Sequence, residues 1–331
     1  MQTPTRPETS TRRRAISGLP TAELVGLLLV AAVLFRDRLQ PLFSDPAVRN
    51  WVTIFVAITI QALPFLVLGV VISGAIAAFV PPSWLARVLP ANPVLSVPMA
   101  SAAGMALPGC ECGSVPIAGR LVARGAPAPA AMAFLLAAPA INPVVLVATA
   151  VAFPGRPQVV AARFLASFLT AVLVGLIWAK VGPDALMDRA RRRVVAADSR
   201  WGTFAGTAHH DFLHAGGFLV VGGITAATLQ TVVPRSVLDT IAGSGILAVA
   251  TMAVLAVVLA ICSEADAFVA ASMWQFSLTS RLVFLVVGPA VDIKLVALQA
   301  GVFGRSFALR FAPLAFFVAV ASALAVGWVL L

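Results

Sequence analysis

Two thiols and a carboxylate stand together in the segment from Pro108 to Gly113, which reads Pro-Gly-Cys-Glu-Cys-Gly. Thiolates favour soft metals and metalloids as partners, and a carboxylate can hold or release a proton. Because proline and glycine break helices, Cys110 and Cys112 could project to one side of an extended turn and jointly bind a soft ion. Glu111 would then serve as a proton carrier. The alternative interpretation is that the cysteines are small apolar fillers.

Further charged residues lie in apolar surroundings, where each costs roughly 2.5–3.5 kcal/mol at the centre of a membrane helix. Besides Glu111 they are Glu264, Asp266, Asp292 and Lys294. Buried charges of this kind need a partner or water, so they predict a functional site. Two simpler interpretations stay open. Some of these residues could lie at the membrane interface, or Asp292 could merely neutralise Lys294.

Two polar motifs complete the set of candidates. Asn142 stands between prolines in Ala-Pro-Ala-Ile-Asn-Pro, which must interrupt a helix and leave a polar spot, unless the prolines only produce a kink. The three histidines fall within His-His-Asp-Phe-Leu-His, at the expected start of a helix over 211–233. His210 and His214 would share a helix face and could bind a metal at a cytoplasmic mouth. They could also be ordinary interfacial residues.

The composition indicates a lipid-embedded chain. Of the 331 residues 60% are hydrophobic and 11% are charged, and the mean hydropathy is +1.00. Apolar runs long enough to cross a hydrocarbon core of about 30 Å include 51–79, 130–152, 211–233 and 307–331. We therefore expect an all-α polytopic membrane protein without a sizeable soluble domain.

The net charge of +10 is concentrated at expected membrane edges, which argues against nucleic-acid binding and for contact with the lipid bilayer. The N-terminal tail 1–20 and the loop 181–210 are rich in arginine, so both are predicted to be cytoplasmic. Segment 21–35 is expected to be a retained extra transmembrane helix. Counting crossings from these points places the C-terminus outside. The expected location is the bacterial inner membrane.

An internal repeat organises the rest of the chain. Residues Phe65–Pro81 match Phe218–Pro234, and Phe134–Phe153 match Phe284–Phe303, which pairs Asn142 with Asp292. These matches define a first repeat over 51–180 and a second over 211–331.

The positions of the basic loops require that each repeat contains a segment that enters and leaves by one face. These segments are 93–127 and 244–280, predicted to be hairpins that are either re-entrant or spanning. Their turns carry Cys110 and Cys262, which correspond in the repeat. The repeats are then inverted, each with a hairpin and a broken helix, as in many secondary transporters.

Four motifs carry a resemblance to a known family: GCECGSVPIAGRLVARG, FLLAAPAINPVV, CSEADAFVAAS and FLVVGPAVDIKL. Over roughly 50–330 the chain resembles the predicted bacterial permease family that includes the ArsP-type organoarsenical efflux permeases. The resemblance implies an inner-membrane permease whose cysteines bind trivalent, thiol-reactive arsenicals. By position it points to these residues: Cys110, Cys112, Cys262, Asn142, Ser263, Glu264, Asp266 and Asp292.

The leading hypothesis is a secondary permease that exports a thiol-reactive metalloid or soft metal species, with proton coupling. Alternatives are a permease for another small ion or solute, and a non-transporting membrane scaffold subunit that uses its basic loop. The phosphate-binding loop, the zinc-protease motif and the hydrolase nucleophile motif are all missing. Neither an enzyme nor a cofactor is therefore expected. The sequence carries no signal for an oligomeric state.

Overall fold

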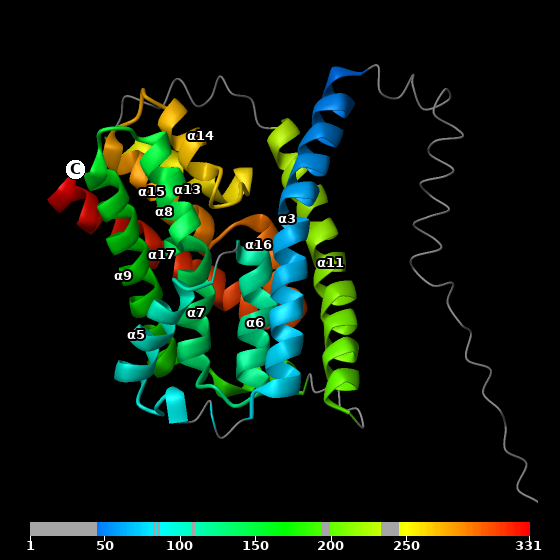
Figure 1. Cartoon of the computed structure of the whole chain (residues 1–331). Helices are drawn as coiled ribbons and strands as arrows, with labels where there is room; N and C mark the ends of the chain where they lie inside the picture. The colour runs from blue at the N-terminus through cyan, green and yellow to red at the C-terminus, as the bar shows by residue number, and fades with distance from the viewer. Residues whose placement is uncertain (1–44, 82–83, 85–86, 108–109, 193–198, 233–244) are drawn as a thin grey trace, which may run out of the picture. The chain divides into compact units, whose positions relative to one another are not determined.

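The computed structural model describes residues 45–81, 84, 87–107, 110–192, 199–232 and 245–331 (Figure 1). The chain divides into two units, Met1–Asn50 and Trp51–Leu331, and the second unit carries the features discussed below. The expected tail 1–20 and the expected helix 21–35 lie outside the described residues.

The described residues form helices and no strands, which is the outcome expected when backbone polar groups must be satisfied in lipid. The all-α polytopic fold predicted from composition is thereby confirmed. The elements in chain order are α3 Pro46–Phe79, α5 Pro93–Gly104, α6 Glu111–Ala123, α7 Ala128–Ile141, α8 Pro143–Ala152, α9 Pro157–Val181, the short 3₁₀ helix η2 Asp184–Met187, α10 Asp188–Arg191, α11 Arg200–Val232, α13 Gly245–Leu259, α14 Asp266–Ser272, α15 Leu278–Ala290, α16 Ile293–Val302 and α17 Arg305–Leu330.

Six helical segments in the described part of the chain are long and apolar enough to cross a membrane. They are Pro46–Phe79, Ala128–Ala152, Pro157–Val181, Arg200–Thr228, Leu278–Val302 and Arg305–Leu330. The expected helix 211–233 therefore begins earlier than predicted, because the helix continues through the polar residues that precede the apolar run. Part of the expected loop 181–210 belongs to this helix, and η2 and α10 occupy another part.

Two pairs of shorter helices occupy the predicted hairpins. The arms α5 and α6 contain 12 and 13 residues, and α13 and α14 contain 15 and 7. At 1.5 Å per residue none of them reaches the roughly 30 Å of a hydrocarbon core. Each described arm is thus shorter than a full crossing, and the choice between re-entrant and spanning hairpins stays a prediction.

Two of the crossing segments are broken at matching positions. The segment 128–152 breaks at Asn142, where α7 ends and Pro143 opens α8. The segment 278–302 breaks at Val291 and Asp292, between α15 and α16. Both breaks have extended backbone, and in both the Asn or Asp side chain accepts a hydrogen bond from the new helix. The prolines of the first motif therefore interrupt the helix, as predicted.

Equivalent helices of the two halves run in opposite directions (Figure 1). In that view α3 descends while α11 rises, and α7 with α8 rises while α15 with α16 descends. The α5–α6 hairpin approaches from the end opposite to α13 and α14. These directions are those that an inverted repeat predicts.

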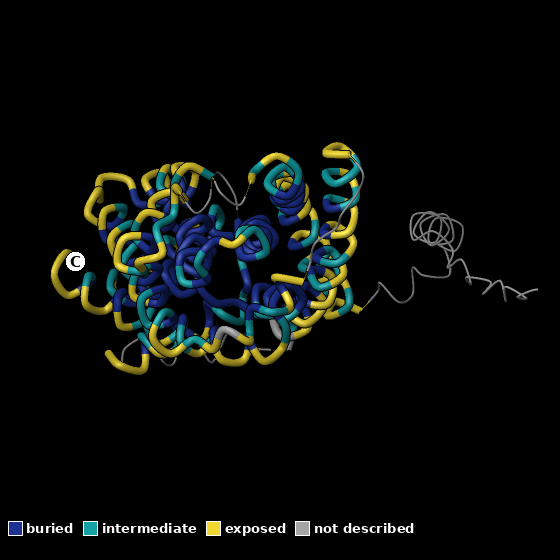
Figure 2. Tube along the Cα trace, turned by 90° about the horizontal axis from the view of Figure 1, so that it is seen from below, coloured by how far each residue is buried: buried dark blue, intermediate teal, exposed yellow. Residues whose placement is uncertain are grey.

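The broken segments form the interior (Figure 2). The most apolar window is 78% buried in Ala128–Ala152 and 83% buried in Leu278–Val302, against 28% in α3 and in α17. The helices that carry breaks and polar caps are therefore shielded from lipid, which is where unwound backbone is tolerated.

Candidate functional site

The ammonium group of Lys294, near the start of α16, is the centre of the site. Its Nζ atom forms ion pairs with Glu111 and, at 3.1 Å, with Oδ2 of Asp292. It also donates to the carbonyl oxygen of Ala260 at 2.8 Å and lies 3.9 Å from Sγ of Cys262. An ammonium group has only three N–H donors, so these neighbours compete for it. We call Glu111, Asp292 and Lys294 the central triad.

The start of α16 positions two members of this triad, Asp292 and Lys294. Asp292 begins α16 by accepting a hydrogen bond at Oδ1 from the Leu295 amide at 2.6 Å, so one carboxylate both caps the helix and pairs with Lys294. On the other side α11 approaches closely through Gly222, where an added Cβ would lie 2.7 Å from Cα of Lys294. The lysine is therefore held by packing as well as by charge.

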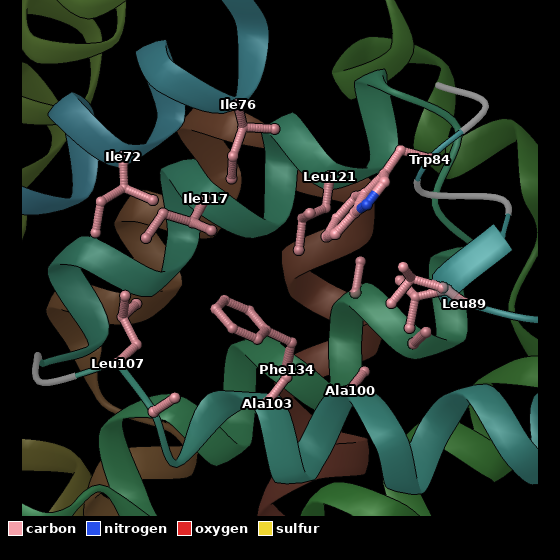
Figure 3. Close-up of a pocket in the computed structure, with 14 residues that line it drawn as sticks. Ile72, Ile76, Trp84, Leu89, Ala100, Ala103, Leu107, Ile117, Leu121 and Phe134 are labelled. Atoms are coloured by element: carbon pink, nitrogen blue, oxygen red, sulfur yellow. The ribbon is translucent and has the colours of Figure 1, made fainter. Parts of the chain in front are cut away.

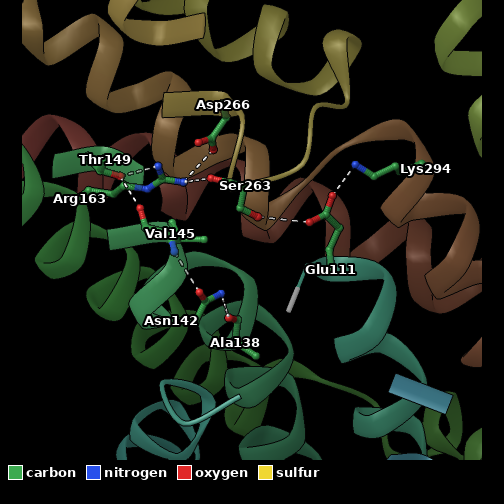
Figure 4. A network of polar contacts seen from close by, with 9 residues as sticks. All are labelled: Glu111, Ala138, Asn142, Val145, Thr149, Arg163, Ser263, Asp266 and Lys294. Atoms are coloured by element: carbon green, nitrogen blue, oxygen red, sulfur yellow. Dashed lines mark hydrogen bonds and ion pairs between the residues drawn. The ribbon is translucent and has the colours of Figure 1, made fainter. Parts of the chain in front are cut away.

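The first hairpin places Glu111, the third member of the triad, next to Lys294. Glu111 is the first residue of α6, and its Oε2 atom accepts a hydrogen bond from Oγ of Ser263 at 3.3 Å (Figure 4). Helix α6 packs against α3 through two glycines, because a Cβ on Gly69 would lie 2.4 Å from Cα of Gly113. The turns of the two hairpins thus meet at Glu111 and Ser263.

The three cysteines gather beside the triad. Cys110 occupies the N-cap position of α6 with extended backbone and makes no capping hydrogen bond, and its thiol lies beside the thiols of Cys112 and Cys262. All three are buried and unpaired by disulfides. The expected extended turn is wrong in one respect, since α6 begins at Glu111 and Cys112 is therefore helical. Helix α5 ends at Gly104, so the two helices of this hairpin are separated by residues 105–110.

In the described part of the chain, the side chains that could bind a metal are not arranged as a metal centre. Within the described residues, no group of three or more His, Cys, Asp or Glu side chains is arranged to hold a metal ion. The pair Cys110 and Cys112 therefore stays a prediction as a two-thiol ligand.

A second buried ion pair joins the two halves. Arg163 of α9 contacts Oδ2 of Asp266 at 2.8 Å and the carbonyl oxygen of Ser263 at 3.1 Å, and its other terminal nitrogen donates to Thr149 at 2.9 Å (Figure 4). Asp266 was a candidate from sequence, whereas Arg163 was missed. Its position inside the apolar run 157–181 was the available signal.

A third buried ion pair also links the halves. The Arg120 guanidinium of α6 lies 3.0 Å from Oδ2 of Asp211 in α11, and Ser73 of α3 donates to the same oxygen at 2.6 Å. Both charged side chains are 4% exposed. Arg120 was not among the site residues predicted from sequence, because its partner Asp211 lies on a different helix.

The remaining candidates are placed as follows. Asn142 donates to the Ala138 carbonyl at 2.9 Å and accepts from the Val145 amide at 3.0 Å, so it bridges the break between α7 and α8. Glu264 follows Ser263 in the second turn, and its carboxylate oxygens are buried without a hydrogen-bond partner in the described part of the chain.

The histidine cluster lies inside α11 rather than at its start, because α11 begins at Arg200. The rings of His210 and His214 stack with centroids 5.8 Å apart, and Nε2 of His214 is 3.1 Å from the carbonyl oxygen of Gly301. The shared helix face predicted from their spacing is therefore present. Their role as metal ligands stays a prediction.

The charges of the centre do not cancel when all groups are ionised. The Arg163–Asp266 and Arg120–Asp211 pairs are neutral, whereas the central triad holds two carboxylates and one ammonium. A single excess negative charge in a buried site attracts a proton or a cationic species. The arrangement can therefore bind and release positive charge next to three thiols.

An apolar pocket of about 290 Å³ lies beside the first hairpin, between α3, α5, α6 and α7 (Figure 3). Ile72 and Ile76 line one wall, Ile117 another, and Phe134 points into the space. Leu107, which also lines the pocket, precedes Cys110 by three residues. None of the residues predicted from sequence to carry chemistry lines this pocket.

These features define a class: an all-α, multi-pass membrane protein in which the turns between short paired helices meet at a buried polar centre. Residues 47–328 match the model of the family ArsP_1, described as "Predicted permease". The chain belongs to this family, and the resemblance inferred from the motifs is confirmed.

Curated relatives support the assignment. The "UPF0718 protein YcgR" of Bacillus subtilis is 37% identical over 77% of this chain and 89% of its own length. A Streptococcus mutans protein named "Putative two-component membrane permease complex subunit" is 31% identical over 85% of this chain and 96% of its own length. The "UPF0718 protein MJ0584" of Methanocaldococcus jannaschii is 30% identical over 35% of the chain. No solved structure matches the chain.

Proposed function

We propose that this permease exports a thiol-reactive metalloid species, organoarsenical-like in its chemistry, or a soft metal species, with a proton as the coupling ion. The observation that carries the proposal is the meeting of Cys110, Cys112 and Cys262 beside the central triad. Thiols supply reversible bonds to a soft, electrophilic centre, and the carboxylates supply sites for a proton.

The binding step conserves atoms and oxidation states. A trivalent arsenical with two hydroxide ligands exchanges them for the sulfurs of Cys110 and Cys112. Each thiol proton combines with a leaving hydroxide to form water as each arsenic–sulfur bond forms. Release reverses the exchange with two waters. Cys262 can replace one of the sulfurs during transfer, and Glu111, Glu264 or Asp266 can take up the coupled proton.

The apolar pocket favours a substrate with an organic group over a bare ion. Its lining is almost entirely apolar, and Leu107 connects it in sequence to the thiol turn. An aryl or alkyl group could occupy such a space while the electrophilic atom engages the thiols. Filling the pocket with Ala103→Trp is expected to reduce transport of a phenyl arsenical while leaving transport of arsenite unchanged.

The ion pairs Arg120–Asp211 and Arg163–Asp266, which we call the outer ion pairs, support alternating access. Each joins an arginine of the first half to an aspartate of the second, and the two pairs lie on opposite sides of the triad. Arg120 follows Glu111 by nine residues along α6, roughly 14 Å toward one end, whereas Arg163 contacts Ser263 and Asp266 at the other hairpin. Rocking of the halves would break one pair while the other stays closed.

Transport by the purified protein in vesicles tests the proposal. Wild-type protein should move a trivalent organoarsenical in response to a proton gradient, and Cys110→Ser should abolish this flux. Ser322→Ala, a similarly small change at a buried position of α17, serves as the control and should leave flux intact. Unchanged flux in Cys110→Ser would eliminate the thiol mechanism. The same vesicles loaded with other ions and solutes test the broader permease alternative.

A second candidate is a membrane subunit that acts only with a partner. It is favoured by one observation, the name of the Streptococcus mutans relative as a subunit of a two-component permease complex. Flux in vesicles that contain only this chain would contradict an obligate partner, whereas flux that requires a co-expressed subunit would support it.

A further inference from the structure

A cleft of about 540 Å³ lies between α8 and α9, next to the turn that joins them. Because α8 and α9 belong to consecutive membrane-crossing segments, this turn marks a membrane edge. The walls of the cleft are apolar, and Arg156 is the charged residue among them. The apolar lining includes Leu146, Ala150, Phe153, Val160, Ala161 and Phe164.

A second arginine stands at the same end of the cleft. The Cζ atom of Arg281 in α15 lies 5.8 Å from the centre of the Phe153 ring, and its Nε donates to the Phe276 carbonyl at 3.1 Å. Phe153 is therefore covered by a guanidinium on one side and lines the cleft on another. Through Phe153, Arg281 therefore adjoins the cleft that Arg156 lines.

Within the described residues no carboxylate forms an ion pair with either arginine. This contrasts with Arg120 and Arg163, which are both paired with aspartates. Two neighbouring guanidinium groups at a membrane edge thus have no counter-ion from the described protein, and such groups attract anionic headgroups.

The turn between α8 and α9 positions Arg156 at the end of the cleft. Gly155 adopts φ +73°, a conformation that strongly favours glycine, and it lets the chain reverse between Phe153 and Arg156. Arg156 precedes the first turn of α9, whose amides have no side-chain cap, so the positive end of a 25-residue helix adds to the guanidinium charges.

We propose that this cleft binds one anionic phospholipid, with its phosphate between Arg156 and Arg281 and an acyl chain along the apolar walls of α8 and α9. Guanidinium groups bind phosphate oxygens by paired hydrogen bonds, and the apolar walls match a hydrocarbon chain. The site is separate from the thiols and the central triad, so it stands whether or not the protein transports an arsenical.

Native mass spectrometry of the detergent-purified protein, titrated with phosphatidylglycerol, tests the proposal. Phosphatidylcholine with the same acyl chains tests the need for net negative charge, and inorganic phosphate tests the need for the chains. The double variant Arg156→Gln/Arg281→Gln is expected to lower phosphatidylglycerol affinity by about tenfold or more. Ala161→Trp, which fills the cleft without changing charge, should lower it as well.

The matched control is Arg305→Gln/Arg310→Gln, which removes the same charge from exposed positions of α17. This control should bind phosphatidylglycerol like the wild-type protein. Equal affinity for the two phospholipids, displacement by inorganic phosphate, or equal losses in the two double variants would each overturn the proposal. Each result can be read without a transport assay.

Discussion

Ser263 donates a hydrogen bond from Oγ to Oε2 of Glu111 across 3.3 Å, and this contact joins the turns of the two helical hairpins. The carbonyl oxygen of Ser263 accepts a hydrogen bond from Arg163. One residue therefore connects the central triad to a second buried ion pair.

Replacing this hydroxyl should loosen the connection. Ser263→Ala keeps the carbonyl contact with Arg163 and removes the donor to Glu111, so the free energy of unfolding should fall by about 1 kcal/mol. Denaturant unfolding in mixed micelles measures the change. Ser272→Ala, whose exposed hydroxyl bonds only to the Val269 carbonyl, should have little effect. Equal losses in both variants would contradict a specific role for Ser263.

The central triad depends on its single cation. Lys294→Met leaves Glu111 and Asp292 buried without a counter-charge, and removing one member of a buried ion pair typically costs about 3–5 kcal/mol. The double variant Lys294→Met/Glu111→Gln removes one of the two carboxylate charges and should recover much of this loss. Thermal unfolding in detergent compares them, and a double variant no more stable than Lys294→Met would count against the triad.

Asp292 has two functions that substitution can separate. Asp292→Asn keeps an oxygen that can accept from the Leu295 amide and loses only the charge that pairs with Lys294. Asp292→Ala loses both, so it should be less stable than Asp292→Asn by about 1 kcal/mol, the usual worth of a helix N-cap. Unfolding measurements that give the two variants equal stability would show that the cap contributes nothing here.

The outer ion pairs should control access to the thiols from opposite sides. Asp266→Asn is expected to expose Cys110, Cys112 or Cys262 to a charged methanethiosulfonate reagent from one side of oriented vesicles, and Asp211→Asn from the other. Asp188→Asn, which disrupts only an exposed pair with Arg191, is the control. Labelling from the same side in both aspartate variants would contradict the arrangement of two gates.

The contact between α3 and α6 should not tolerate a side chain. A Cβ at Gly69 would lie 2.4 Å from Cα of Gly113, so Gly69→Ala must separate the helices and is expected to cost about 1–3 kcal/mol. Gly217→Ala in α11 meets no atom within 4 Å and should be neutral or slightly stabilising. Unfolding free energies of the two variants test this, and a tolerant Gly69 would mean that the helices are not fixed here.

The sequence by itself determined the class of fold and most of the central residues. Hydropathy is a local property, so the apolar runs 51–79, 130–152, 211–233 and 307–331 each fell on a crossing segment, and the repeat of Asn142 and Asp292 identified the two breaks. Charges inside apolar runs are costly, and this cost singled out Glu111 and Lys294 as functional candidates.

Only the tertiary structure decided which of these residues meet. Arg163 and Arg120 were not predicted as site residues, because their partners, Asp266 and Asp211, lie far away in the sequence on other helices. The start of α11 was also placed too late, because hydropathy rises after the helix has begun. Pairing depends on how helices cross, and crossing depends on close contacts such as that of Gly69 with Gly113, which no local pattern records.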